Sequence, residues 1–125
     1  MQKTRGMAEA EFTKAIIKFE KEYLGRGPLE ARTVFIDDMV LVRLQGILTN
    51  AETTLAQNED GRALVKEMRR QLFETSVPLL QEIVADVTGC EMVSMHTDMS
   101  TTTGERIVVF VLSENVAEKF PVSRK

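Results

Sequence analysis

The chain has few of the side chains that disulfides and most metal sites need. Its 125 residues include one cysteine, Cys90, one histidine, His96, and no tryptophan. A single cysteine cannot form an internal disulfide, and one cysteine with one histidine cannot build a His/Cys-rich zinc site. A chain of this length buries roughly two-thirds of its unfolded surface, so it can fold without either. We predict no metal site and no cofactor, and the sparse cysteine is typical of a reduced cytoplasm.

Long apolar runs are also absent. The longest, Ile107 to Leu112, has the length of a strand, whereas a membrane-spanning helix needs about 18 apolar residues. The first residues, MQKTRGMAEAE, lack the apolar segment of a secretory signal. Seven glycines and three prolines are too few for a flexible linker. We therefore predict one cytoplasmic domain over residues 1–125, with a core over about 7–113 and a polar C-terminal tail over 114–125.

Neither sign of charge dominates the sequence. Sixteen lysines and arginines stand against 19 aspartates and glutamates, which gives a formal net charge of −3. A general nucleic-acid binder must neutralise many phosphates, so this acidic balance disfavours nucleic acid as a partner. Apolar residues make up 43% and charged residues 28%, a composition that excludes general disorder.

The first periodic segment, residues 7–24, predicts an amphipathic helix. Its apolar side chains recur at spacings of four, three and four residues, at Phe12, Ile16, Phe19 and Tyr23. Gly25 follows where a left-handed helix cap is expected, and Pro28 prevents the helix from continuing. The helix is therefore expected to end near residue 24.

Two pairs of short, β-branched segments predict two hairpins. The paired segments are 32–36 with 39–44, around Asp37-Asp38, and 91–98 with 105–112, around a polar, threonine-rich loop. Alternation along the second segment points Arg43 away from its apolar neighbours Val42 and Leu44. This alternation indicates a sheet that is covered on one side and partly wet on the other.

Helical patterns fill the segment between the hairpins. Thr49 and Glu52 have the spacing of a capping box, which starts a short helix. A longer pattern covers residues 62–87, with its apolar stripe at Leu64, Met68, Leu72, Leu80, Ile83, Val84 and Val87. Pro78 lies inside this pattern, so either the helix kinks there or two helices meet. The sequence thus predicts an α+β fold in the order α-ββ-α-α-ββ, with a four-stranded, mainly antiparallel sheet and its helices on one face.

The segment Gly25-Arg26-Gly27-Pro28 is the sharpest local motif. Its two glycines permit close backbone approach and Arg26 can pair with a phosphate or carboxylate, so one interpretation is an anion-binding turn. The other interpretation, which we favour, is a helix cap followed by a proline-fixed turn. The spacing matches neither a Walker loop nor a dinucleotide-binding fingerprint.

A second basic cluster comprises Arg62, Lys66, Arg69 and Arg70. On a helix, the first three share a face that could meet an anionic ligand, a partner's carboxylates or RNA. Nearby acidic residues favour a simpler interpretation, a solvated face laced with ion pairs. Arg69 and Arg70, together with the four residues of the Gly25 to Pro28 turn, are the candidate ligand or partner contacts.

No combination of side chains forms a convincing catalytic site. His96 and Asp98 alternate along a strand and could act as a base and its orienting carboxylate, but no nucleophile accompanies them. Cys90 follows a glycine and is typical of a small, partly buried apolar residue. Asp37 and Asp38 could contribute to a cation site, although paired aspartates are normally turn residues. We predict no catalytic residues.

Several segments, in this order along the chain, together carry a family resemblance. They are Gly25-Arg26-Gly27-Pro28, residues 38–44, residues 48–55, Arg69 or Arg70, residues 88–93 and residues 109–112. The chain resembles the MpsC-like family of bacterial proteins, long described as a domain of unknown function, over roughly residues 12–112. The family's Gly-x-Gly-Pro turn fits Gly25, Gly27 and Pro28, and its Leu-Thr-x-x-Glu-x-x-Leu stretch fits Leu48, Thr49, Glu52 and Leu55.

The resemblance implies an accessory role and brings no catalytic residues with it. The family is associated with a bacterial membrane-potential-generating, ion-translocating system linked to inorganic-carbon supply. We therefore expect a non-catalytic, cytoplasmic accessory or regulatory interaction module, with a membrane-transporter subunit as a possible partner. We also expect a homo-oligomer, because the hairpins leave sheet edges that a second copy could pair with or cover.

The alternative function is a sensor or enzyme that binds a small anionic metabolite. Arg26 with Arg69 or Arg70 would hold the anion, and His96 would transfer a proton. The two functions differ in a simple observation, because only the second requires an anion to stabilise the protein.

Overall fold

Nine helices and strands make up the part of the chain that the structure, a computed structural model, describes, residues 3–122. The strands are β1 (Glu30–Ile36), β2 (Met39–Gln45), β3 (Met92–Ser100) and β4 (Glu105–Leu112). The helices are α1 (Arg5–Tyr23), α2 (Asn50–Leu55), α3 (Glu59–Thr75), α4 (Val77–Thr88) and α5 (Val116–Lys119). The predicted α+β class and the order α-ββ-α-α-ββ are confirmed, with α5 as an addition at the end.

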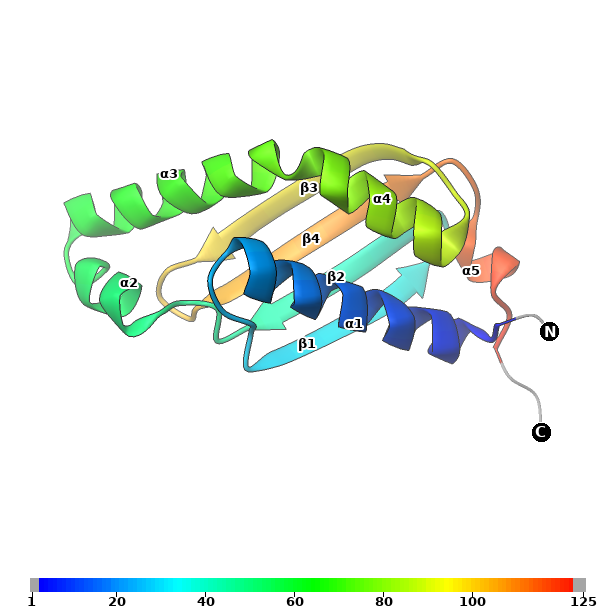
Figure 1. Cartoon of the computed structure of the whole chain (residues 1–125), viewed down its shortest axis with the longest axis horizontal. Coiled ribbons are helices and arrows are strands. Elements are labelled where there is room, and N and C mark those ends of the chain that lie inside the picture. The colour runs from blue at the N-terminus through cyan, green and yellow to red at the C-terminus, as the bar shows by residue number, and fades with distance from the viewer. Residues whose placement is uncertain (1–2, 123–125) are drawn as a thin grey trace.

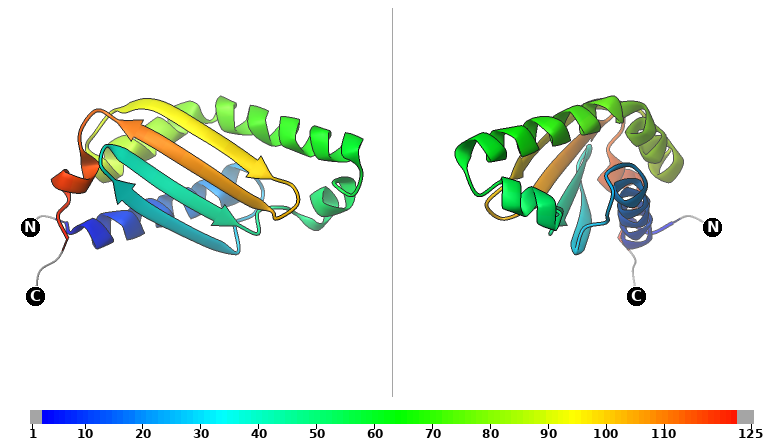
Figure 2. Two further views of the ribbon diagram at one scale, coloured as in Figure 1. Left: turned by 180° about the vertical axis from the view of Figure 1, so that it is seen from behind. Right: turned by 60° about the vertical axis from the view of Figure 1, so that its left-hand side comes forward.

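The four strands form one antiparallel sheet in the order β1-β2-β4-β3. Each sequence hairpin forms as expected, and the first turns at Asp37, whose φ of 52° lies in the left-handed region that aspartate tolerates in tight turns. Pairing of β2 with β4 joins the two hairpins, so that β1 and β3 are the edges. Helices α1, α3 and α4 lie on one face of this sheet (Figure 1), and the opposite face is seen without cover from behind (Figure 2).

The core fills the space between the sheet and the helices that cover it. The ring of Phe12 on α1 lies 5.5 Å from the ring of Phe110 on β4 and 6.5 Å from that of Phe35 on β1. Phe19, two turns farther along α1, meets Phe73 of α3 with their rings 5.7 Å apart. These contacts connect α1 to both hairpins and to α3, and they bury Phe12, Ile16 and Phe19 of the predicted stripe. Tyr23, its last member, is 50% exposed because it lies at the end of the helix.

The chain divides into two helices close to Pro78. Ser76 is both the C-terminal cap of α3 and the N-terminal cap of α4, and Pro78 stands in the first turn of α4. A proline there costs no hydrogen bond, because the first amides of a helix have no partner within it. Of the two alternatives that the sequence left open, two helices that meet is the one the structure adopts. Helix α4 ends at Gly89, which takes the left-handed conformation with φ of 70°.

The apolar stripe expected on the first half of the long helix does not face the core. Leu64, Met68 and Leu72 are 59%, 45% and 37% exposed. Helix α3 instead buries a second four-residue repeat, at Gly61, Val65, Arg69 and Phe73. Close packing selects that face: a Cβ at Gly61 would lie only 1.7 Å from the carbonyl oxygen of Leu55 at the end of α2. A leucine at that position would keep the two helices apart.

The core also extends beyond residue 113, where the sequence placed the start of a polar tail. Val116 of α5 and Phe120 are buried, and the ring of Phe120 lies 5.8 Å from that of Phe35. Arg5 at the start of α1 donates a hydrogen bond from Nε to the carbonyl oxygen of Phe120 at 3.0 Å. The segment up to Phe120 is thereby held against the first helix and β1.

Candidate functional site

Four charged side chains are buried together under the helices. They come from four elements: Glu20 from α1, Glu52 from α2, Arg69 from α3 and Arg106 from β4. Each is between 1% and 9% exposed. Buried charges are costly unless they are paired, so a group of four is unusual for a chain of this size. We refer to these four residues as the buried charge cluster.

The pair Glu52 and Arg69 has all the contacts that a buried ion pair needs. Arg69 donates from Nε to Oε2 of Glu52 at 2.8 Å and from Nη2 to Oε1 at 2.7 Å. Its Nη2 also donates to the carbonyl oxygen of Ile47 at 2.9 Å. Glu52 is held in turn by the predicted capping box, in which the amide of Thr49 donates to Oε1 at 2.9 Å. The pair thus fixes α3 against α2 and the segment before it.

Opposing effects set the ionisation of Glu52. Burial acts to raise the pKa of its carboxyl group, but hydrogen bonds from Arg69 and Thr49 and the positive charge of Arg69 outweigh it. The pKa of Glu52 is therefore lowered, and the carboxyl group is ionised at neutral pH.

Arg106 is the second buried guanidinium and is less completely bound. It donates from Nη1 to Oγ1 of Thr97 at 2.8 Å, and its guanidinium stacks over the ring of Phe73 at 4.2 Å. Its Nε is buried without a hydrogen-bond partner within residues 3–122. Burial lowers the pKa of Arg106 to about 10, with the charge of Glu20 acting in the opposite direction.

Glu20 is the least satisfied member of the cluster. Both carboxyl oxygens are buried, and neither has a hydrogen-bond partner in the described part of the chain. Burial raises the pKa of Glu20 to about 7, although the charges of Arg69 and Arg106 act to lower it. A carboxyl group with this pKa gains or loses its proton near neutral pH.

The sequence contains a signal for this cluster, which its analysis did not use. Glu20 continues the four-residue spacing of Phe12 and Ile16, so it occupies an apolar position of the helix. Arg106 alternates with Val108 and Phe110 on the inner face of β4. Charged residues at core positions are the pattern that predicts a buried polar group.

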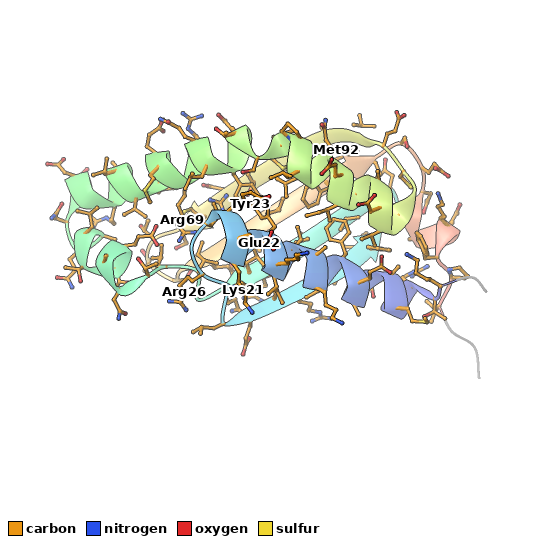
Figure 3. The ribbon with its side chains drawn as sticks, viewed as in Figure 1. Lys21, Glu22, Tyr23, Arg26, Arg69 and Met92 are labelled. Carbon is orange, nitrogen blue, oxygen red and sulfur yellow. The ribbon has the colours of Figure 1, made fainter. Side chains whose placement is uncertain are left out.

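The Gly25 to Pro28 turn follows the end of α1 and contacts the same loop as Arg69 of the buried charge cluster. Gly25 has φ of 94°, which agrees with the expected left-handed residue after the helix. Arg26 donates from Nη1 to the carbonyl oxygen of Leu48 at 3.0 Å, next to the carbonyl that Arg69 binds. The two arginines therefore hold neighbouring carbonyls of one loop, and Figure 3 shows both near this end of α1.

The adjacent arginines of α3 have different environments. Arg69 points inward to Glu52, whereas Arg70 is about half-exposed and binds Glu67 and Glu74 of its own helix. With Lys66, Arg70 and Asp98, Arg106 lines a recess of about 180 Å³ beside β3. Lys66 pairs with Asp98 at 3.3 Å in this recess.

The other sequence candidates are apart from one another. His96 lies 3.2 Å from Oγ of Ser94, while Asp98 binds Lys66 and the amide of Met99 rather than the histidine. Cys90 is buried at the end of α4. Within residues 3–122, no group of three or more His, Cys, Asp or Glu side chains is arranged to hold a metal ion.

Comparison with known proteins places the chain in a family. A family described as Na+-translocating membrane potential-generating system (MpsC) matches residues 4–114. The chain belongs to the MpsC family. It is 40% identical over 116 residues to the uncharacterized protein YbcI of Bacillus subtilis (strain 168), and the matched region covers 93% of this chain and 94% of YbcI. It is 28% identical over 113 residues to the uncharacterized protein YrhF of the same organism, 87% of this chain and 90% of YrhF. No solved structure matches.

This MpsC-family chain has two exposed apolar surfaces, of which the sequence predicted an uncovered sheet face but not an exposed stripe on α3. One is the stripe of Leu64, Met68 and Leu72 on α3, which we call the α3 stripe. The other is the uncovered face of the sheet (Figure 2). Among residues 3–122 no helix has the length and apolar character to cross a membrane.

Proposed function

We propose that this MpsC-family protein is a cytoplasmic accessory module that regulates a bacterial Na+-translocating, membrane-potential-generating system by contact rather than by catalysis. The family description supports the link to such a system. The observation that carries the proposal is the α3 stripe. The module also self-associates, as the sequence predicts.

The α3 stripe has the form of a surface for helix packing. Leu64, Met68 and Leu72 follow one another at intervals of four residues, and all are more than a third exposed. Glu67, Gln71 and Thr75 flank them in a shallow recess of about 380 Å³. A contiguous apolar strip with a polar border is typical of a docking site, and its four-residue ridges fit the ridges of a second helix. The occupant that we propose is an apolar helix face on a cytoplasmic segment of a membrane subunit.

The buried pair of Glu52 and Arg69 supports this surface from below. It fixes the rotation of α3, so that the leucines and the methionine point outward. Arg70 and the Gly25 to Pro28 turn are further candidate contacts for the partner, and Arg70 is about half-exposed on the side of α3 that faces β3. Arg69 acts in this proposal by positioning α3.

The experiment that tests the proposal uses cells that lack the gene. They receive the wild-type gene, a stripe variant with Leu64→Glu and Leu72→Glu, or a control with Val122→Glu. Val122 is 63% exposed, close to the 59% of Leu64. We expect the wild type and control to co-purify with tagged membrane subunits of the system and to restore Na+-dependent membrane potential. The stripe variant should fold normally and lose both properties. Retention of both by a folded stripe variant would contradict the proposal.

A second candidate function, anion sensing, is favoured by the recess over Arg106. Its three cations, Lys66, Arg70 and Arg106, exceed its two acidic residues, Glu67 and Asp98, and Nε of Arg106 is unpartnered within residues 3–122. Phosphate or bicarbonate at 100 times its dissociation constant should stabilise the protein by about 2.7 kcal/mol. Arg70→Ala should abolish the resulting thermal shift. If neither anion shifts the unfolding temperature of the wild type, this candidate is excluded.

A further inference from the structure

The uncovered face of the sheet is apolar at its centre. Strand side chains alternate between faces, so the residues between those of the core point away from the helices. Strand registration brings six of them into two adjacent rows across β1, β2 and β4: Ile36, Met39 and Val111, then Val34, Leu41 and Val109. Ile36 is exposed, and the other five are half-buried. No element within residues 3–122 packs on them (Figure 2).

The sequence of β4 is that of a strand covered on both sides. From Ile107 to Leu112 it has six apolar residues without a polar one. An antiparallel strand with one wet face alternates apolar and polar residues, whereas a continuous apolar run is typical of strands buried on both faces. The inner residues of β4 meet the core, so its outer residues lack the cover that their sequence predicts.

The charges around this apolar centre are unevenly distributed between its two halves. Arg32 of β1 and Arg43 of β2 lie directly opposite each other in the strand register, which is an unfavourable pair of like charges. The acidic residues lie on the other half of the face, Glu105 on β4 and Asp98 on β3. Arg43 reaches Glu105 at 2.6 Å, but Arg32 has no ion pair within the described residues. Glu30 also lies on the outward side of β1, so the half formed by β1 and β2 carries two arginines and one carboxylate and is net cationic. The half formed by β4 and β3 carries the two carboxylates and is net anionic.

We propose that a second copy of this chain covers the face, with the two-fold axis between the sheets and parallel to the strands. This inference rests on the proposed self-association and names the surface that joins the copies. Such an axis places β1 over β3 of the other copy and β2 over its β4, at the small angle usual for packed sheets. Arg32 then faces Asp98 of the partner subunit, and Arg43 lies beside Glu105 of the partner subunit.

The alternative two-fold axis, perpendicular to the strands, fits the face poorly. It would reverse the strands and place the apolar row that contains Ile36 on the opposite row, which contains Glu30 and Gln45. It would also superpose β1 on β1, which leaves the cationic half against the cationic half of the other copy. The parallel axis is thus the one that matches apolar rows to apolar rows and arginines to carboxylates.

The footprint of the face is close to the smallest size of a specific interface. Strands spaced about 4.8 Å apart that rise about 3.3 Å per residue give a footprint of about 440 Å² for four strands of seven residues. Two copies together bury about 900 Å² by this measure, close to the lower limit of about 1,000 Å² for a specific interface.

Sedimentation velocity of the full chain from about 1 to about 200 μM, a range that spans micromolar dissociation constants, tests the proposal. We expect a reversible dimer in the wild type and at least a tenfold weaker one in Leu41→Glu, which places a charge at the centre of the face. Leu64→Glu on the α3 stripe is the matched control and should dimerise as the wild type does. A wild type that stays monomeric at every concentration overturns the proposal, as does a Leu41→Glu variant that dimerises with unchanged affinity.

A charge exchange tests the orientation of the two copies and does not depend on an altered core. Arg32→Glu and Asp98→Lys should each weaken self-association, because each sets like charges against one another twice. An equimolar mixture of the two variants should regain dimers, since both contacts between positions 32 and 98 then join side chains of opposite charge. Lys66→Ala, which removes the ion pair of Asp98 within its own chain, should leave dimerisation unchanged. Absence of recovery in the mixture overturns the parallel axis.

These outcomes are separate from those of the proposed function. A monomeric wild type that still co-purifies with the membrane subunits through the α3 stripe removes the dimer and leaves the regulatory role intact. A dimer that is lost in Leu41→Glu but never engages those subunits does the reverse.

Discussion

Arg69 and Glu52 form a two-pronged ion pair inside the protein, with Nε and Nη2 of the arginine bound to the two carboxylate oxygens at 2.8 and 2.7 Å. The pair joins α3 to α2 across 17 residues of sequence and sets which face of α3 is buried. The exposure of the α3 stripe is a consequence of this rotation. The ion pair and the proposed docking surface are therefore two aspects of one arrangement.

Removal of Arg69 should destabilise the protein strongly. Breaking a buried ion pair leaves an uncompensated charge, so we expect Arg69→Ala to lower the free energy of unfolding by about 3–5 kcal/mol. Arg70→Ala, which removes an exposed arginine one residue away, should have a much smaller effect, because exposed ion pairs contribute little to stability. Urea unfolding followed by circular dichroism measures both, since the chain has no tryptophan. Equal effects of the two substitutions would contradict the burial of Arg69.

Glu20 should make stability depend on pH. Its pKa rises from 4.5 in the unfolded chain to about 7 in the folded protein, so the folded state binds more protons between these values. The contribution of Glu20 is therefore fully present below pH 4.5 and is lost as the pH rises through 7. At about 1.4 kcal/mol per pKa unit, this loss amounts to about 3 kcal/mol.

The variant Glu20→Gln isolates this contribution. It should match the wild type near pH 4.5 and exceed its stability at pH 8, because an amide avoids the buried charge. The lowered pKa of Glu52 acts in the opposite direction, but it is present in both proteins and cancels in their difference. A difference in unfolding free energy that is constant from pH 4.5 to 8 would show that Glu20 does not titrate as described.

Two glycine substitutions should have opposite effects. Gly61→Ala places a methyl group against the carbonyl of Leu55, and overpacking of this kind costs about 1–3 kcal/mol or more. Gly6→Ala in α1 meets open space and should raise stability by about 0.5–1 kcal/mol, because alanine loses less conformational freedom in a helix. Thermal unfolding of the two variants is sufficient, and a neutral Gly61→Ala would argue against the close approach of α2 and α3.

Adjacent residues of α3 should differ sharply in their effect on stability. Phe73 is buried between Phe19 and Arg106, so Phe73→Ala should cost about 3–5 kcal/mol. Leu72→Ala removes an exposed side chain and should change stability by about 0.5 kcal/mol or less. The measurement is denaturant unfolding at neutral pH. A larger loss in Leu72→Ala than in Phe73→Ala would mean that the apolar repeat of the sequence faces the core after all.

Local patterns predicted the elements well where short-range physics decides them. Gly25 and Gly89 end their helices, the Thr49 and Glu52 box starts α2, and Asp37 turns the first hairpin. Each of these features depends on backbone geometry within a few residues, which sequence spacing records directly. The break near Pro78 was open to two interpretations, because proline is accepted equally at a kink and in the first turn of a new helix.

The candidate site was less accessible to sequence reasoning. Arg69 was identified as a contact candidate, but its partner Glu52 was considered only as a capping residue. Glu20 and Arg106 were not singled out, although each interrupts an apolar pattern. A pattern shows that a charge is misplaced but not which other charge compensates it, since the partners are up to 86 residues apart.

By itself, the sequence determined the α+β class, the order of the elements and the two hairpins, because turn chemistry and periodicity act over a few residues. Only the tertiary structure decided which repeat of α3 is buried and which strands become neighbours. Both repeats of α3 satisfy the helical period, and the choice depends on the contact of Gly61 with α2 and of Arg69 with Glu52. The pairing of β2 with β4 likewise depends on the burial of the shared core, and it creates the apolar face that no single strand could present.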